Sequence, residues 1–213
     1  METRDAILGR RSARSFTPEP IDEAVIRDIL DLAHWAPSWG NAQDWNVYVI
    51  TGDALERVKK EYLRKMRDGE ESPTDFTMPS RDQWPERMLA RMNLTRPGET
   101  FRPPPGPSIW EMYGAPCMIV LAIDDGIVPE YACFDAGLLV ENICLAAHDV
   151  GLATVIMAVG VRYPDVLRDV IPGPGGKRFV ISVALGHAAP DAPVNSIPRA
   201  RADLGDLVTW VKQ

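Results

Sequence analysis

The chain has 213 residues, 46% of them hydrophobic and 25% charged, and its formal net charge is -7. This length and composition suffice for one domain with a substantial core, and they exclude a disordered chain. An acidic protein is repelled by a polyphosphate backbone, so we expect no nucleic-acid partner.

The sequence also bears on location. The longest apolar run, Cys117 to Ile123, is too short to span a bilayer, and the N-terminus lacks the apolar stretch of a signal peptide. The cysteines Cys117, Cys133 and Cys144 have no metal-binding spacing and lie in apolar segments. We therefore expect a cytoplasmic protein without membrane partner or metal site, whose cysteines serve as small hydrophobes.

The first third of the chain predicts a helix, a strand and a second helix. Apolar residues recur at helical spacing from Asp22 to Trp35, and Pro37 ends this helix. Trp45 to Ile50 predicts a strand. Asp53, with Glu56 three residues later, predicts a capping box that opens the next helix.

The second half predicts the rest of the sheet and a long helix. Cys117 to Ile123 is apolar throughout, which predicts a central strand. Tyr131 to Val150 predicts a helix that is apolar nearly all round, which suits either the centre of a monomer or a dimer interface. Thr154 to Val159 and Phe179 to Gly186 predict two more strands. Between them, a proline at the first helical position starts a helix from Tyr163 to Val170.

Two segments depart from this regular pattern within an otherwise single domain, residues 1–213. Residues 61–113 form a variable insertion, whose aromatic side chains either cover a ligand or pack the insertion onto the domain: Phe76, Trp84, Phe101, Trp110 and Tyr113. Residues 191–213 are rich in Pro and Ala, which predicts an extended C-terminal arm. That arm must bury Leu207 and Trp210 somewhere.

A basic motif near the N-terminus carries the first chemical signal. Arg10, Arg11, Ser12 and Arg14 place three guanidiniums and a hydroxyl within five residues. This set suits a phosphate dianion, because arginine binds oxyanions bidentately and keeps its charge. Alone, such a motif is more typical of a solvated face or a nucleic-acid contact. In an acidic chain it indicates a local anionic ligand.

A second motif follows about one helix later. Pro37, Ser38 and Gly40 suppress regular structure, which predicts a loop carrying Asn41 and Gln43. The two amides can donate to and accept from the edge of a heterocycle. A planar, phosphorylated ligand satisfies both motifs.

Together these motifs resemble the nitroreductase family of FMN flavoproteins, whose patterns read Arg-Arg-Ser-x-Arg-x-Phe and Ala-Pro-Ser-x-x-Asn-x-Gln-Pro-Trp. The first pattern is matched through Phe16, and the second is matched except at Asp44, where the family usually has Pro. Three later segments are similar in the same order: Gly151 to Thr154, Ala184 to His187 and Pro198 to Arg201. The resemblance covers nearly the whole chain.

The resemblance implies an α+β fold with a central, mostly antiparallel sheet flanked by helices. It also implies an intertwined homodimer, in which the helix at 131–150 lies along the dimer axis and the arm at 191–213 crosses onto the partner.

For the cofactor, the resemblance implies FMN, with NADH or NADPH as electron donor. It assigns the phosphate to Arg10, Ser12 and Arg14, completed by Arg201. Arg11 would face the ribityl chain or a carboxylate, and Arg199 is a weaker match; a solvated arm is the alternative for Arg199 and Arg201. The remaining cofactor-binding candidates lie near the flavin ring, the first three reaching it from the partner subunit and the last three beside its reactive edge: Pro37, Ser38, Trp39, Asn41, Gln43, Met157, Ala158 and Val159.

The implied activity is transfer of hydride from NAD(P)H to nitroaromatic or quinone-like acceptors by a ping-pong mechanism. No catalytic side chain is required, because the redox chemistry belongs to the cofactor. The alternatives are a flavoenzyme of this fold acting on another acceptor, by enone reduction, dehalogenation or dehydrogenation, and a flavin redox sensor without turnover.

Overall fold

The structure is a computed structural model that describes residues 1–77, 83–94 and 106–212. Its α-helices are α1 (Thr3–Gly9), α2 (Glu23–Ala33), α3 (Gly52–Asp68), α4 (Glu86–Asn93), α5 (Pro129–Asp149) and α6 (Pro164–Val170). Its strands are β1 (Trp45–Thr51), β2 (Cys117–Asp124), β3 (Ala153–Met157) and β4 (Lys177–Gly186). Short 3-10 helices are η1 (Trp39–Asn41), η3 (Ile109–Gly114), η4 (Ala158–Val161), η5 (Pro193–Ser196) and η6 (Leu204–Asp206).

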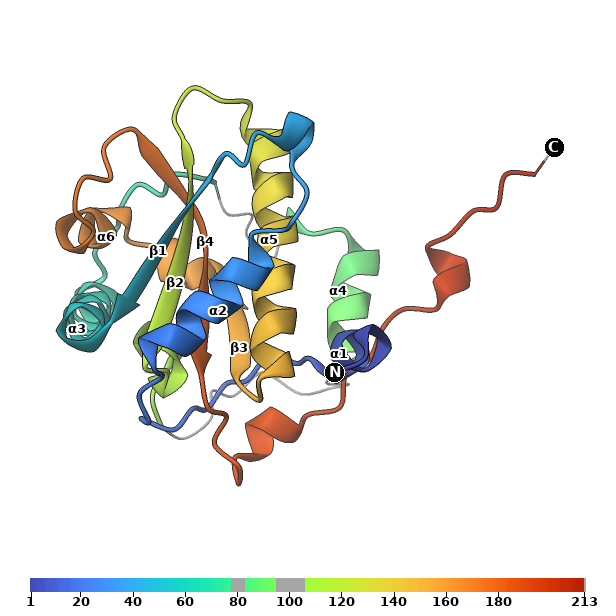
Figure 1. The fold of residues 1–213 in the computed structure, drawn as a ribbon, viewed down its shortest axis with the longest axis horizontal. Coiled ribbons are helices and arrows are strands. Elements are labelled where there is room, and N and C mark those ends of the chain that lie inside the picture. The colour runs from blue at the N-terminus through green and yellow to red at the C-terminus, as the bar shows by residue number, and fades with distance from the viewer. Residues whose placement is uncertain (78–82, 95–105, 213) are drawn as a thin grey trace.

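The described strands form one antiparallel sheet in the order β1-β2-β4-β3 (Figure 1). Side chains of β2 alternate between two hydrophobic clusters: Met118 and Val120 enter one, Ile119 and Leu121 the other. The first cluster lies under α3 and α6, and the second lies under α2 and α5. The expected α+β fold and the central position of the apolar strand are confirmed.

Helix starts follow the sequence signals at two positions and depart from them at a third. The Asp22 side chain caps α2 by accepting the Ala24 N–H at 2.9 Å, and Pro164 begins α6 as expected. The capping box predicted at Asp53 is wrong, because α3 begins one residue earlier, without a side-chain cap. Gly52 has a φ of 55°, which turns the chain into the helix before Asp53 is reached. Asp53 lies in the first turn, where its negative charge interacts favourably with the positive end of the helix dipole.

Both ends of the predicted insertion pack on the domain. At its start, α3 continues without a break through Asp68. At its end, Tyr113 of η3 is buried, and the Trp110 ring lies 5.7 Å from the Tyr163 ring. Between them, Phe76 lies under the Arg178 guanidinium at 4.1 Å. Trp84 is half-buried, and Phe101 is outside the described residues. Phe76, Trp110 and Tyr113 thus pack the insertion onto the domain.

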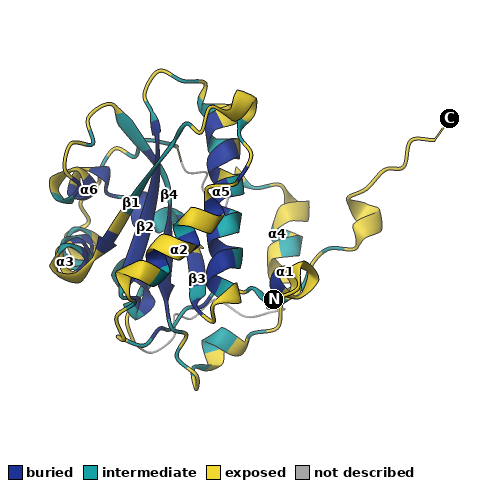
Figure 2. Cartoon of the chain, in the orientation of Figure 1, coloured by how far each residue is buried: buried dark blue, intermediate teal, exposed yellow. Residues whose placement is uncertain are grey.

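Apolar surface remains uncovered along α5 and along the arm. One side of α5 is buried against α2 and the sheet, but Tyr131 and Phe134 are 61% and 65% exposed. The arm leaves the body of the chain (Figure 1) and is exposed through η6 to its end (Figure 2), with Trp210 78% exposed. Leu207 and Trp210 are therefore not buried by their own chain. None of the helices described here is both long and apolar enough to cross a membrane.

The strand predicted from Thr154 to Val159 is two residues too long, because β3 ends at Met157 and η4 follows. The chain turns there to bring Gly160 against β4, so closely that a Cβ at position 160 would lie 1.9 Å from Ser182 Oγ. The Ser182 hydroxyl donates to the Met157 carbonyl at 2.9 Å, and the Tyr62 hydroxyl donates to the Gly160 carbonyl at 2.7 Å. Two buried side chains thus fix the turn after β3.

The Tyr62 bond to this turn is open to a direct test. Burial raises the pKa of Tyr62, so its hydroxyl remains a proton donor. Tyr62→Phe leaves the Gly160 carbonyl without this donor, and we expect it to lower the free energy of unfolding by about 1 to 3 kcal/mol. Urea denaturation measures the change, with Tyr48→Phe on half-buried β1 as the matched substitution. Equal stability of Tyr62→Phe and the unaltered protein would contradict this role.

Candidate functional site

The arginine-rich segment runs beside the first residues of β3. Ser12 forms a parallel bridge with Thr154, and the Ala13 N–H donates to the Thr154 carbonyl at 2.9 Å. Ala13 is buried, while Ser12 and Arg14 on either side of it are half-buried. The backbone of this segment is therefore held by the sheet, and its polar side chains lie at the edge of the core.

Arg10 carries an unsatisfied donor. Its Nε lies 3.2 Å from Oε1 of Glu141 on α5, and its side chain is only 17% exposed. Nε is buried and has no hydrogen-bond partner in the described part of the chain, because the ion pair lies outside hydrogen-bond geometry. A buried charged donor without an acceptor is costly. A guanidinium in this state is suited to an incoming oxyanion.

Further arginines gather around Arg10. Arg199 donates to the Arg10 carbonyl, and Arg11 Nη1 donates to the Asn195 carbonyl at 3.1 Å. Partial desolvation lowers the pKa of Arg199, and the positive charges of Arg11, Arg10 and Arg201 lower it further. These guanidiniums repel one another, so a bound dianion would stabilise the group. The donor set fits a phosphate.

The two arm arginines differ in what they contact. Arg199 reaches the N-terminal segment at the carbonyls of Leu8 and Arg10. Arg201 is exposed and donates to the Ala200 carbonyl at 2.8 Å. The weaker sequence match is therefore the arginine that the structure joins to the N-terminal segment.

The loop after α2 has a shape fixed by its own backbone. Gly40, Asn41 and Gln43 have φ values of 57°, 59° and 50°, in the left-handed region. Ser38 Oγ accepts the Gln43 N–H at 2.9 Å, and Gln43 Nε2 donates to Asn41 Oδ1 at 3.3 Å. The predicted loop forms with a short turn of 3-10 helix, and its two amide side chains face each other. Non-glycine residues held in the left-handed region, here Asn41 and Gln43, are typical of binding sites.

The same loop is attached to the N-terminal half of α5. The Trp39 N–H donates to Asp135 Oδ2 at 2.8 Å, while the Trp39 side chain is 72% exposed and Pro37 is also exposed.

Asp44, in the position where the resembling pattern has Pro, has a buried Oδ1 for which the described residues offer no hydrogen-bond partner. Burial and the charge of Asp135 raise the pKa of the Asp44 carboxyl.

The third predicted group, Met157 to Val159, lies at the end of the strand that holds Ser12. Met157 is buried, and Ala158 and Val159 are half-buried at the start of η4. The first N–H groups of a helix have no acceptor within it. Thr154 and Met157 lie about 10 Å apart along β3, at about 3.3 Å per residue. An elongated ligand can therefore place its phosphate at one end of β3 and its ring at the other.

Within one chain the basic segment lies beside the arm and the start of β3, and the loop at 37–43 is attached to α5 at a separate point. Arg10 contacts α5 at Glu141, whereas the loop contacts it at Asp135, about 9 Å away along the helix. In Figure 1, η1 lies beside the N-terminal end of α5, and α1 lies beside its other half. The loop therefore faces a different part of the surface from the arginines.

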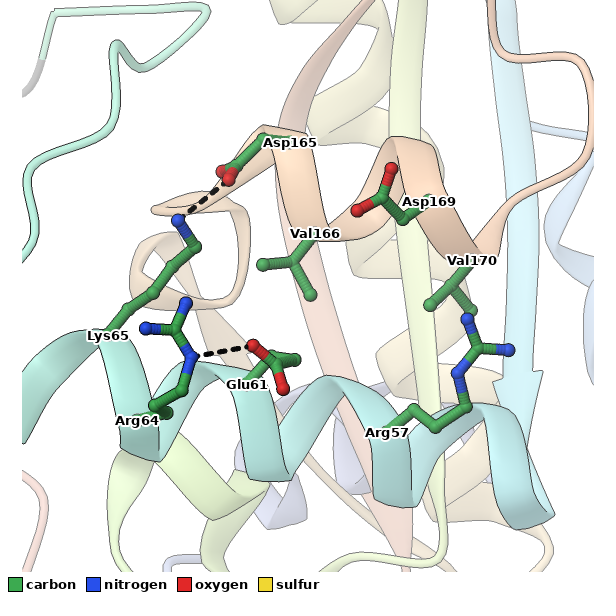
Figure 3. Close-up of a pocket in the computed structure, with 8 residues that line it drawn as sticks. All are labelled: Arg57, Glu61, Arg64, Lys65, Asp165, Val166, Asp169 and Val170. Carbon is green, nitrogen blue, oxygen red and sulfur yellow. Dashed lines mark hydrogen bonds and ion pairs between the residues drawn. The ribbon is translucent and has the colours of Figure 1, made fainter.

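A groove of about 320 Å³ between α3 and α6 lies outside all predicted site residues (Figure 3). Four of its charged side chains form two ion pairs: Lys65 Nζ lies 2.8 Å from Asp165, and Arg64 Nε lies 2.9 Å from Glu61. Glu70 binds both Arg64 and Lys65, and these bonds lower its pKa to about 2. The groove is an ion-pair network that joins the two helices.

Sequence reasoning missed two residues at the arginine cluster, Glu141 and Asn195. Glu141 was hidden within an apolar helix pattern. Asn195 stands out only as an amide within a Pro- and Ala-rich arm. Its hydrogen-bond partners are far away in the chain: Arg14 precedes it by 181 residues and Ser15 by 180.

Comparison with known proteins identifies relatives over the whole length of the chain. The nitrobenzene nitroreductase of Ectopseudomonas oleovorans is 28% identical over 98% of this chain and 96% of its own length. A nitroreductase with bound FMN from Desulfitobacterium hafniense is 27% identical, with a TM-score of 0.67 over 100% of this chain and 99% of that one. The fold also matches the nitroreductase NfnB of Sphigopyxis sp. strain HMH, at 24% identity and a TM-score of 0.88 over 100% of both chains.

The sequence model described as the Nitroreductase family matches residues 7–187, which include the arginine segment, the loop and all four strands. This protein therefore belongs to the nitroreductase family.

Proposed function

We propose that this protein is an FMN-dependent oxidoreductase that takes hydride from NADH or NADPH and reduces nitroaromatic or quinone-like acceptors. The observation that carries the proposal is the cluster of arginines beside β3, in a chain with a net charge of -7. Phosphate matches this cluster in charge and hydrogen-bonding geometry. The relatives support the proposal: one is named for nitrobenzene, and one of the matching structures has bound FMN.

Arg10, Ser12 and Arg14 hold the FMN phosphate in this proposal. Arg10 has the unsatisfied buried nitrogen, and Ser12 and Arg14 lie at the edge of the core beside it. Arg199 and Arg201 add charge from the arm. Arg11 contributes charge while its guanidinium holds the Asn195 carbonyl.

The loop at 37–43 serves the flavin of the other subunit. Its separation from the arginine cluster within one chain supports this assignment. Pro37, Ser38 and Trp39 reach across to the ring, and the amides of Asn41 and Gln43 offer donors and acceptors to its edge. Each of the two sites is then built from both chains.

Met157, Ala158 and Val159 lie beside the reactive edge of the ring, where backbone N–H groups at the start of η4 can bond to flavin N5. When bound, FMN supplies a ring that accepts hydride from the nicotinamide and delivers it to the acceptor. The chain binds the phosphate, orients the ring and leaves one ring face open. No side-chain acid or nucleophile is needed.

A homodimer is part of the proposal. The exposed aromatic residues Tyr131 and Phe134 on α5, and Leu207 and Trp210 on the arm, need a partner surface to remove them from water. A second copy offers the same α5 face, and the arm is long enough to leave its own body (Figure 1). The location we propose is the cytoplasm, where NAD(P)H is supplied and the free cysteines stay reduced.

The phosphate assignment predicts the effect of Arg14→Ala. Losing one charge-assisted contact should weaken FMN binding by about 1.5 to 3 kcal/mol, which is roughly tenfold to a hundredfold in affinity. Quenching of FMN fluorescence on titration measures the change. Arg57→Ala, in the groove between α3 and α6, is the matched control and should bind FMN normally. Full FMN retention by Arg14→Ala, or isolation with FAD instead of FMN, would contradict the assignment.

The two-chain site predicts the effect of truncating the arm before Leu204. The shortened chain should associate more weakly and also release FMN, because arm contacts across the dimer would be lost. Sedimentation velocity and flavin absorbance report the two effects on one sample. Trp210→Ala should weaken the dimer in the same direction but less. A flavin-bound monomer at micromolar concentration would overturn the two-chain site.

A single open ring face predicts ping-pong kinetics. The nicotinamide and the acceptor are both planar and must use the same face in turn, so the oxidised nicotinamide leaves before the acceptor enters. Double-reciprocal plots with varied NAD(P)H at several nitroaromatic concentrations should give parallel lines. Intersecting lines, with a ternary complex on the reduced enzyme, would mean two separate sites. Absence of turnover despite bound FMN would favour the redox-sensor alternative.

A further inference from the structure

Asn195 joins the arm to the arginine-rich segment through its side chain. Its Oδ1 accepts the Arg14 N–H at 2.7 Å. Its Nδ2 donates to the Ser15 carbonyl at 2.8 Å and to the Ala189 carbonyl at 3.2 Å. Both ends of this amide are therefore used, as its donor and acceptor groups allow.

These bonds complete a clamp on the backbone of residues 13–15. On one side the Ala13 N–H is bound to Thr154 of β3, and on the other the Arg14 N–H is bound to Asn195. The Ser15 carbonyl also accepts the Ala189 N–H at 3.0 Å. The position of Arg14 thus depends on the sheet and on the arm together.

The same residue meets a second arginine through its backbone. The Asn195 carbonyl accepts Arg11 Nη1 at 3.1 Å. Four residues later the arm delivers Arg199, which binds the Arg10 carbonyl. Asn195 therefore lies at the point where the arm attaches to the cluster, beyond the residues 7–187 that match the family.

From this arrangement we infer that Asn195 is a positioning residue for phosphate binding, which holds Arg14 and Arg11 in the geometry that receives the anion. The inference rests on the proposed function. It differs from a general structural role, because its effect falls on the phosphate of FMN and not on the ring. Riboflavin carries the same ring without the phosphate, so its affinity distinguishes a positioning role at the phosphate from a general structural role.

The experiment compares FMN and riboflavin affinities of the full chain and of Asn195→Ala. The alanine side chain cannot make the three hydrogen bonds of the Asn195 amide to the Arg14 N–H and to the Ser15 and Ala189 carbonyls, so the clamp loosens. We expect FMN to bind about tenfold more weakly, as for a loss of one to two hydrogen bonds, and riboflavin to change less than twofold. Asn195→Ser, which keeps one short donor and acceptor, should lie between. Asn46→Ala, which removes another half-buried asparagine at the start of β1, on the sheet edge opposite β3, should change neither affinity.

A double-mutant cycle with Arg14→Ala tests whether Asn195 acts through Arg14. If it does, Asn195→Ala should cost much less FMN affinity in the Arg14→Ala background than alone. Additive losses would overturn the positioning role. Equal losses of FMN and riboflavin, or unfolding of both Asn195 variants in thermal melts without flavin, would show a structural residue instead and also overturn it.

The outcomes separate this inference from the proposed function. If the unaltered protein binds FMN and riboflavin equally, the phosphate site itself is wrong. If the unaltered protein prefers FMN and Asn195→Ala keeps that preference, the phosphate site stands and the role of Asn195 is wrong.

Discussion

The candidate site depends on holding several arginines close together although their positive charges repel one another. The arginine segment near the N-terminus is placed by main-chain bonds, from Ala13 to β3 and from the Phe16 bridge with Ala188. Neither bond involves a charged group. The main chain thus holds the segment without a ligand, and in the site that we propose a bound dianion relieves the repulsion among Arg10, Arg11 and Arg199.

The division of the predicted site along α5 follows from the same scaffold. Strand β3 and the arm lie at one end of this helix, whereas Asp135 holds the loop after α2 near the other. In the dimer that we propose, the two groups at one flavin come from different chains. The exposed aromatic residues of α5, Tyr131 and Phe134, lie at the end of the helix that holds the loop.

Much of the fold could be predicted because its signals are local. The apolar run of β2 indicated a strand with covered faces, and Pro164 marked the first residue of α6. The residue at which β3 ends could not be predicted from a local sequence signal. It is set by the contact of Gly160 with Ser182, two residues far apart in the chain whose fit depends on the absence of a Cβ.

The candidate site shows the same limit. Arg10, Ser12 and Arg14 were recognisable because they stand together in the chain, and the structure places their segment beside Thr154 at the start of β3. The resemblance ranked Arg201 above Arg199, but the contacts of these two residues could not be predicted from the sequence. Their contacts depend on where the arm attaches, which is decided by Asn195 and its distant partners.

The loop at 38–43 is self-supporting, and this has a consequence for protein engineering. Its shape comes from left-handed backbone at Gly40, Asn41 and Gln43 and from bonds made by Ser38 and Asp135. The indole of Trp39 is largely exposed, and only the main chain of this residue is tied to α5. Position 39 is thus a place where a library of side chains can alter the exposed surface of the loop while the loop keeps its shape.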